Sequence, residues 1–327
     1  MDNRVFIFPG SDHVFQALFY EARKLSNVRV AKNLFKEQIV EKKIARIQRI
    51  PGAWRLFRQP LLRFYDKQIN FIEEVVSGDI LVFSNISIRY VSLSLLKKLK
   101  ENGVKLILYF IDSISNVNAK DAFAYTKKMN FDLVYSFDKE DAVRYRYNHF
   151  YTMYSKLSER QEPIDLKYDA CFNGSDKGRL KLLCQLKKNC PSAKFFVNML
   201  NISDEVRDAN GFQSNKSIDY TASIDYVIDS NCILDLVADP NQSGLSLRAY
   251  EAVVYNKKIL TNNPSIKTFP YYRPEYMKYV ENMDDVDENF IKERIMVDYE
   301  YKGEYSPVVF INDIVSRIKD KTLSLNS

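Results

Sequence analysis

YDACFNGSDKGRLKLLCQLKK, residues 168–188, contains the pattern that decides the fold class. An apolar run predicts a strand over Tyr168–Gly174, and the amphipathic stretch Gly178–Lys188 predicts a helix. Two of the nine glycines in the chain, Gly174 and Gly178, stand at the two ends of the loop between them. A strand that runs through such a loop into a helix is the repeating unit of parallel α/β sheets.

The same alternation of short apolar runs and helical stretches extends in both directions from this segment. Further strands are predicted over residues 5–10, 27–32, 79–85, 104–112, 131–138, 193–200, 257–263 and 277–280, with two more inside 224–239. Helices are predicted over 13–24, 93–102, 245–255 and 306–318, and over 39–71 with breaks at 50–52 and at Pro60.

This alternation restarts after a polar stretch near residues 155–163, which predicts two doubly wound α/β domains. We place the N-terminal domain at 1–160 and the C-terminal domain at 161–305. The helix in 306–327 is expected to pack back on the N-terminal domain. In such sheets ligands bind beyond the carboxyl ends of the strands, so the loops after strands are the places to search.

Cysteine and histidine usage argues against a metal site. The four cysteines show no C-x-x-C spacing, and the chain has only two histidines, so we predict no metal and reduced thiols in a cytoplasmic protein. The N-terminal residues lack the pattern of a signal peptide. No apolar run approaches the ~18 residues that a spanning helix needs.

The net charge of +6 is concentrated in one segment. Residues 36–67 contain nine basic and three acidic side chains, a surplus of six. The wider segment 36–71 interleaves these cations with apolar residues, including the only tryptophan, Trp54. It is expected either to lie on an anionic membrane surface or bind a lipid-pyrophosphate acceptor, or to be a solvated helical excursion. No nucleic-acid reader fold is recognisable, so nucleic acid is not expected as a partner.

Two loops in the C-terminal half have the composition of anion sites. The first contains Gly174, Lys177 and Arg179, where a helix N-terminus and two cations suit a phosphate; a plain strand-to-helix turn is the alternative. The second contains Ser243 and Gly244 before a helix that carries Arg248 and Glu251. These two charged residues lie three apart in an apolar helix, where they are either a surface ion pair or functional groups.

This second stretch resembles the nucleotide-sugar site of GT-B glycosyltransferases of bacterial polysaccharide and lipopolysaccharide synthesis. The resemblance lies in a Gly-Leu loop, a helix with Glu251-Ala252, and the strand Lys257-Lys-Ile-Leu-Thr261, and it covers roughly 168–263. It implies that Glu251 binds the ribose hydroxyls and that Lys177 and Arg179 lie where the family places diphosphate-binding cations. Ser243 stands where many members carry a second acid, so the family's two-acid pattern is broken here.

The resemblance implies a GT-B fold, with two Rossmann-like domains facing a cleft, and an acceptor bound by the N-terminal domain. Asp112, just after an apolar strand, is the first candidate for the base that takes the acceptor proton. Asp12 and His13, after the first strand, are further candidates, although Ser11 or Asp12 also suits a helix N-cap.

The expected function is metal-independent transfer of a sugar, with a nucleotide-diphosphate sugar (UDP first) as donor and no other cofactor. The acceptor would be a hydroxyl of a glycan or lipid-linked glycan, and the protein cytoplasmic or peripheral at the inner face of the plasma membrane. Three alternatives stay open: a nucleotide-sugar epimerase on the same fold, a non-catalytic nucleotide-sugar-binding subunit, and a two-lobed binding protein.

Overall fold

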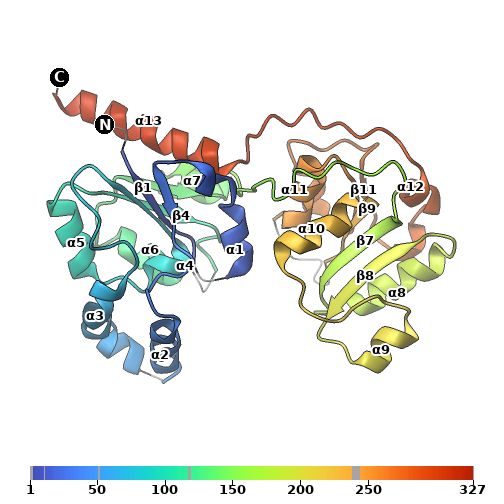
Figure 1. The fold of residues 1–327 in the computed structure, drawn as a ribbon, viewed down its shortest axis with the longest axis horizontal. Coiled ribbons are helices and arrows are strands. Elements are labelled where there is room, and N and C mark those ends of the chain that lie inside the picture. The colour runs from blue at the N-terminus through green and yellow to red at the C-terminus, as the bar shows by residue number, and fades with distance from the viewer. Residues whose placement is uncertain (1–2, 11, 51, 117–118, 238–243, 327) are drawn as a thin grey trace. The chain divides into compact units, whose positions relative to one another are not determined.

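The computed structural model describes residues 3–10, 12–50, 52–116, 119–237 and 244–326. These form two compact units, residues 1–155 with 305–327 and residues 156–304. Each unit is a parallel sheet with helices packed against it (Figure 1). The prediction of two doubly wound α/β units is therefore confirmed.

The first unit has a six-stranded sheet in the order β2-β1-β3-β4-β5-β6. All of its strand pairs are parallel. The strands are β1 (Val5–Phe8), β2 (Val28–Val30), β3 (Ile80–Ser84), β4 (Lys105–Phe110), β5 (Leu133–Ser136) and β6 (Asn148–His149). The helices are α1 (His13–Leu18), α2 (Gln38–Gln48), α3 (Ala53–Tyr65), α4 (Asn85–Ile88), α5 (Leu93–Glu101), α6 (Lys120–Thr126), α7 (Lys139–Tyr145) and α13 (Pro307–Asn326).

Buried aliphatic and aromatic side chains cover both faces of this sheet, as expected where helices pack on each side. On one face α13 inserts Phe310, whose ring centroid lies 5.0 Å from that of Tyr109 and 5.0 Å from that of Tyr135. The Tyr135 hydroxyl donates to Asp313 of the same helix over 2.7 Å. The C-terminal helix is thus an integral layer of the first unit.

The second unit has a five-stranded parallel sheet in the order β11-β10-β9-β7-β8. Its strands are β7 (Tyr168–Ser175), β8 (Phe195–Leu200), β9 (Ser230–Asp235), β10 (Lys258–Thr261) and β11 (Met277–Tyr279). Its helices are α8 (Arg179–Asn189), α9 (Asp204–Ala209), α10 (Tyr220–Ile228), α11 (Leu247–Val254) and α12 (Glu288–Lys292). Because β9 has β7 on one side and β10 on the other, the loops after these three strands share one edge.

Two predictions of secondary structure are wrong. The predicted break at Pro60 does not occur, and Pro60 lies inside α3. Proline has no N–H to donate to the carbonyl oxygen of Leu56, four residues earlier. Because Leu56 is exposed, water can donate to that oxygen instead. The strand predicted from Ile224 is helix α10. Asp219 caps this helix by accepting from the amides of Thr221 and Ala222, and the apolar residues that suggested a strand form its buried face.

Candidate functional site

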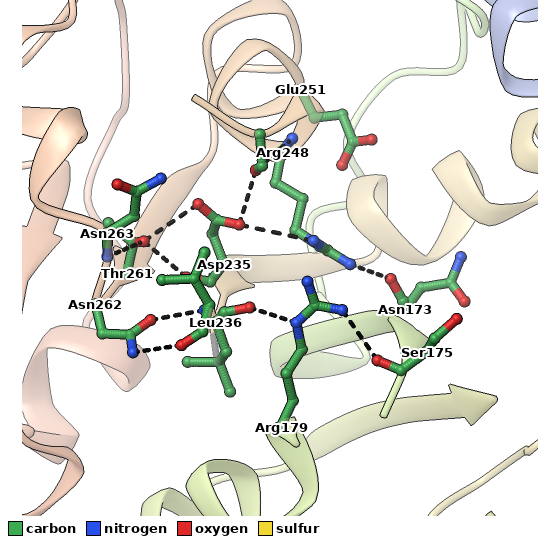
Figure 2. Close-up of polar contacts among 12 residues, drawn as sticks. Asn173, Ser175, Arg179, Asp235, Leu236, Arg248, Glu251, Thr261, Asn262 and Asn263 are labelled. Carbon is green, nitrogen blue, oxygen red and sulfur yellow. Dashed lines mark hydrogen bonds and ion pairs between the residues drawn. The ribbon is translucent and has the colours of Figure 1, made fainter. Parts of the chain in front are cut away.

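Two arginines meet at the carboxyl edge of the five-stranded sheet, as Figure 2 shows. Arg179 begins α8, directly after the loop that follows β7, and Arg248 lies in the first turn of α11. Their guanidinium groups lie next to one another, close to the end of β9. Arg179 donates to the carbonyl oxygens of Ser175 (3.0 Å), the last residue of β7, and Leu236 (2.6 Å), the first residue after β9.

Only one carboxylate is bound directly to this pair of arginines among the described residues. Asp235, the last residue of β9 and almost fully buried, lies 3.6 Å from Nη1 of Arg248. It also accepts hydrogen bonds from the hydroxyls of Ser246 (2.7 Å) and Thr261 (3.2 Å). Two guanidinium groups against one carboxylate leave a surplus of positive charge at a partly buried position.

Of the two arginines, Arg179 is the one whose positive charge is less compensated by the described residues. Burial, and then the charge of Arg248, lowers the pKa of Arg179 from its ordinary value. Its direct acceptors are neutral carbonyl oxygens. A bound anion would offset both the desolvation and the like-charge repulsion, so the arrangement favours a phosphate or diphosphate at this edge.

Gly174 makes room for Arg248. The Nη2 atom of Arg248 donates to the carbonyl oxygen of Asn173, and the guanidinium carbon lies 5.2 Å from the centre of the Phe172 ring. A Cβ atom on residue 174 would lie 2.7 Å from Nη2. This contact gives a physical reason for glycine at the position, beyond the loose turn that the sequence suggested.

We therefore expect Gly174→Ala to displace the Arg248 guanidinium and to weaken nucleotide binding about tenfold, since a charge-assisted contact contributes roughly 1.5–3 kcal/mol. Calorimetric titration with nucleoside diphosphates would measure it. The control is Gly303→Ala in the same unit, where an added Cβ meets nothing within 4 Å, although the φ of 95° adds a backbone strain that Gly174, whose φ is not positive, does not carry. Equal weakening of nucleotide binding by the two changes would mean that displacement of Arg248 is not the cause.

Glu251 lies one turn after Arg248 on α11 but does not pair with it. It is 6% exposed and accepts a 2.5 Å hydrogen bond from the hydroxyl of Tyr220. Burial raises the pKa of the Glu251 carboxyl. The hypothesis of a surface ion pair between Arg248 and Glu251 is wrong, because each residue has another partner. A carboxylate buried at such a cost suits a functional role.

The remaining predicted donor-site residues are placed as follows. Lys177 is exposed, has a φ of 41° and forms no ion pair among the described residues. Asp176 accepts from the amide of Leu180 over 2.8 Å, so it uses one N–H of the α8 N-terminus that the sequence left for a phosphate. Gly244 has a φ of 89°, and its carbonyl oxygen accepts from Asn263. Ser243 lies outside the described residues.

Sequence reasoning missed the polar residues that hold this edge together. Asp235 was included in one predicted strand and Asn262 and Asn263 in the next, and none of them was assigned a role in the site. The amide of Asn262 forms two 2.8 Å hydrogen bonds with the backbone of Val237, and Asn263 ties Gly244 to the end of β10. A signal was available, since each of these residues directly follows or ends a buried strand.

The first unit carries the other candidates at the carboxyl edge of its own sheet. Asp112, after β4, accepts a 3.2 Å hydrogen bond from Asn85, a fully buried residue that also accepts from the amide of Ile111. Asp12 is the N-cap of α1 and accepts from the amide of Val14 over 2.8 Å, as the capping alternative predicted. His13 is exposed at the first position of that helix.

Two hollows lie near the sheet edges. A cavity of about 70 Å³ at the carboxyl edge of the first sheet is lined by residues that include Gly10, Glu41 and Arg89. A hollow of about 380 Å³ in the second unit is lined by Lys167, Lys187 and Lys194 among others. It lies at the amino ends of β7 and β8, opposite the arginine pair, and is separate from the candidate donor site. Within the described ranges, no group of three or more His, Cys, Asp or Glu side chains is arranged to hold a metal ion.

Solved structures of other proteins match this chain over almost its whole length. Anabaena HepE in complex with UDP-glucose matches with a TM-score of 0.53 and 12% identity, over 98% of this chain and 99% of that one. The UDP-N-acetylglucosamine 2-epimerase of Rickettsia bellii matches with 0.51 and 11%, over 97% and 98%. The chain has the GT-B fold.

A candidate UDP-N-acetylglucosamine 2-epimerase from Listeria monocytogenes also shares this GT-B fold. It matches with a TM-score of 0.56 and 10% identity, over 98% of both chains. No protein-family model matches the chain, and no curated protein matches it by sequence. At such identities the comparisons establish the fold, and the chemistry has to be argued from the side chains.

Proposed function

We propose that the chain is a glycosyltransferase. It moves a sugar from a nucleotide-diphosphate sugar, with UDP as the first choice of nucleotide, to a hydroxyl of a glycan or lipid-linked glycan in cell-surface polysaccharide synthesis. The observation that carries the proposal is the pair of neighbouring arginines at the carboxyl edge of the second sheet, in which Arg248 contacts the buried carboxylate of Asp235 and Arg179 donates to neutral carbonyl oxygens. The complex of HepE with UDP-glucose on the same fold supports this class of donor.

The second unit would hold the donor. Arg179 and Arg248, with Lys177 at the exposed rim, would stabilise the negative charge that develops on the leaving diphosphate, without a metal ion. Glu251 would accept hydrogen bonds from the ribose hydroxyls through the oxygen that Tyr220 does not occupy. The rigid backbone contacts of Arg179 and Asn262 would keep these groups in place between substrate molecules.

The first unit would supply the base for an acceptor hydroxyl. Asp112 lies just beyond β4, and the buried amide of Asn85 orients its carboxylate by donating to one oxygen. The other oxygen would take the proton as the hydroxyl attacks the anomeric carbon, which is the requirement of an inverting transfer. Asp12 is the second choice, because its carboxylate already caps α1.

UDP-N-acetylglucosamine 2-epimerase is the second candidate function, because two of the solved structures that share the fold carry that name. The two reactions differ in the bond that is broken. Transfer breaks the bond between the anomeric carbon and the diphosphate and needs an acceptor. Epimerisation at C2 breaks and re-forms a C–H bond on the same molecule, so the returning proton comes from the enzyme or from water.

Incubation with UDP-N-acetylglucosamine or UDP-glucose in deuterium oxide distinguishes these functions. For a transferase we expect slow release of UDP and free sugar when water replaces the acceptor, with no deuterium in the recovered UDP-sugar. Mass spectrometry of the remaining substrate measures both. Asp112→Asn should slow the release, and exposed Asp320→Asn in the same unit should not. Deuterium in a UDP-N-acetylhexosamine would overturn the transferase proposal in favour of the epimerase.

A further inference from the structure

The helices α2 and α3 form a pair between β2 and β3, at one end of the first unit (Figure 1). Their inner faces belong to the core of that unit, through Val40 and Ile44 of α2 and Leu62 of α3. The rest of the pair is exposed, and its composition is unusual for a surface.

The outer face of α3 is apolar. Leu56 is 74% exposed, Phe57 60% and Phe64 74%. Leu56 and Phe64 are eight residues apart and Phe57 and Phe64 seven, so all three lie on one side of the helix, with exposed Pro60 between them. Single exposed apolar residues are normal, whereas three large ones on a single helix face mark a surface that binds something.

Ile39 at the start of α2 and Ile50, two residues after its end, are exposed as well. Thirteen large hydrophobic side chains are exposed among the described residues, and five of them lie between Ile39 and Phe64. This concentration in one helical pair separates the patch from the scattered exposure found elsewhere on the molecule.

The helix that packs against α3 carries exposed cations. Lys42, Lys43 and Arg46 are exposed on α2, followed by exposed Arg49. Within the described part of the chain none of the four forms an ion pair, whereas Lys36 and Arg58 of the same segment pair with Glu73 and Asp121. The patch therefore combines free positive charge with large apolar side chains.

The positive charge of this surface indicates which kind of partner binds it. A second copy of this chain would bring two surfaces of the same positive charge together, which disfavours a symmetric interface. An anionic bilayer offers the complement of both features, since its headgroups attract lysine and arginine while Leu and Phe enter the boundary with the acyl chains. None of the helices in the described residues is long and apolar enough to cross a membrane, so this contact would be with the surface.

We propose that the α2–α3 pair binds the surface of an anionic lipid bilayer, with Leu56, Phe57 and Phe64 inserted and the cations of α2 against the headgroups. This proposal does not rest on the proposed glycosyl transfer. A protein with the transferase activity and no lipid binding, or the reverse, would separate the two.

Co-sedimentation with lipid vesicles tests the proposal. We expect the protein to sediment with vesicles of phosphatidylcholine and phosphatidylglycerol, not with phosphatidylcholine alone, and to be released by salt. Leu56→Ser/Phe57→Ser/Phe64→Ser should reduce the partition coefficient by at least about tenfold, because the inserted apolar area is lost. Val143→Ser/Ile164→Ser/Met296→Ser, at sites 74%, 102% and 88% exposed, is the matched control and should bind like the wild type.

A charge series provides a second, independent test. Lys42→Glu/Lys43→Glu/Arg46→Glu should abolish binding, whereas Lys97→Glu/Lys98→Glu/Lys319→Glu, with the same change in net charge at other exposed sites, should largely preserve it. The proposal is overturned if the wild type ignores anionic vesicles or if the serine triple variant binds unchanged. It is equally overturned if the patch variants abolish self-association or binding to single-stranded DNA while leaving vesicle binding intact.

Discussion

Arg248→Ala is expected to lower the free energy of unfolding by about 3 kcal/mol, because it leaves the buried carboxylate of Asp235 without its cation. The loss should fall at the low end of the range for broken buried pairs, since the hydroxyls of Ser246 and Thr261 still donate to Asp235. Binding of a nucleoside diphosphate should weaken about 10- to 100-fold as one charge-assisted contact disappears. Chemical denaturation and calorimetric titration measure the two effects.

The double variant Arg248→Ala/Asp235→Asn separates the structural effect from the functional one. Removing the orphaned charge should restore most of the lost stability, because a neutral amide in the same place costs far less to bury. It should not restore nucleotide binding, since the arginine is still absent. Recovery of both would mean that Arg248 acts only through the integrity of the sheet edge, and would remove it from the proposed donor site.

Glu251→Gln is expected to stabilise the protein at pH 7 and to weaken nucleotide binding. Burial raises the pKa of Glu251 above its ordinary value of 4.5, so the folded state holds the proton more tightly than the unfolded chain. The associated stability is fully present below pH 4.5 and is lost as the pH rises through the folded pKa. Glutamine escapes this loss and still accepts from Tyr220.

Thermal unfolding across pH measures this difference. The midpoint of Glu251→Gln should exceed that of the wild type at pH 7, and the gap should close as the pH falls toward 4. The exposed residue Glu281 in the same unit offers the control Glu281→Gln, for which no such pH-dependent gap is expected. A lower midpoint for Glu251→Gln at neutral pH, with nucleotide affinity unchanged, would show that the ionised carboxylate is structural.

The layered fold was predictable because it depends on patterns that are local in sequence. Apolar runs of strand length such as residues 104–112 and 168–174 favour buried strands, and β4 and β7 lie there. Helix α10 was misassigned because Ile224, Val227 and Ile228 form a short apolar run that suits either structure. The capping side chain of Asp219 was the signal that distinguishes them.

The candidate site was only half predictable. Arg179 was singled out by its place in a glycine-containing loop at a helix N-terminus, and Arg248 and Glu251 because charged residues in an apolar helix need a reason. The partners of Arg248 were not predicted. Asp235 lies 13 positions and Asn173 75 positions before Arg248, and no local sequence pattern points to either contact. Residues 36–71 were predicted as a possible membrane-binding segment, but its exposed residues Leu56, Phe57 and Phe64 were not, because the helical period alone does not say which side of a helix meets the core.

Thermal unfolding with a panel of nucleotides tests the central claim, that the edge formed by Arg179, Arg248 and Glu251 binds a nucleoside diphosphate. The panel is UDP, GDP, TDP, CMP and ADP. A ligand at about 100 times its Kd adds roughly 2.7 kcal/mol, which corresponds to a midpoint increase of about 5–10 °C. The account predicts this increase with one nucleoside diphosphate in the wild type and a much smaller one in Glu251→Gln. An unchanged midpoint with every nucleotide would contradict it.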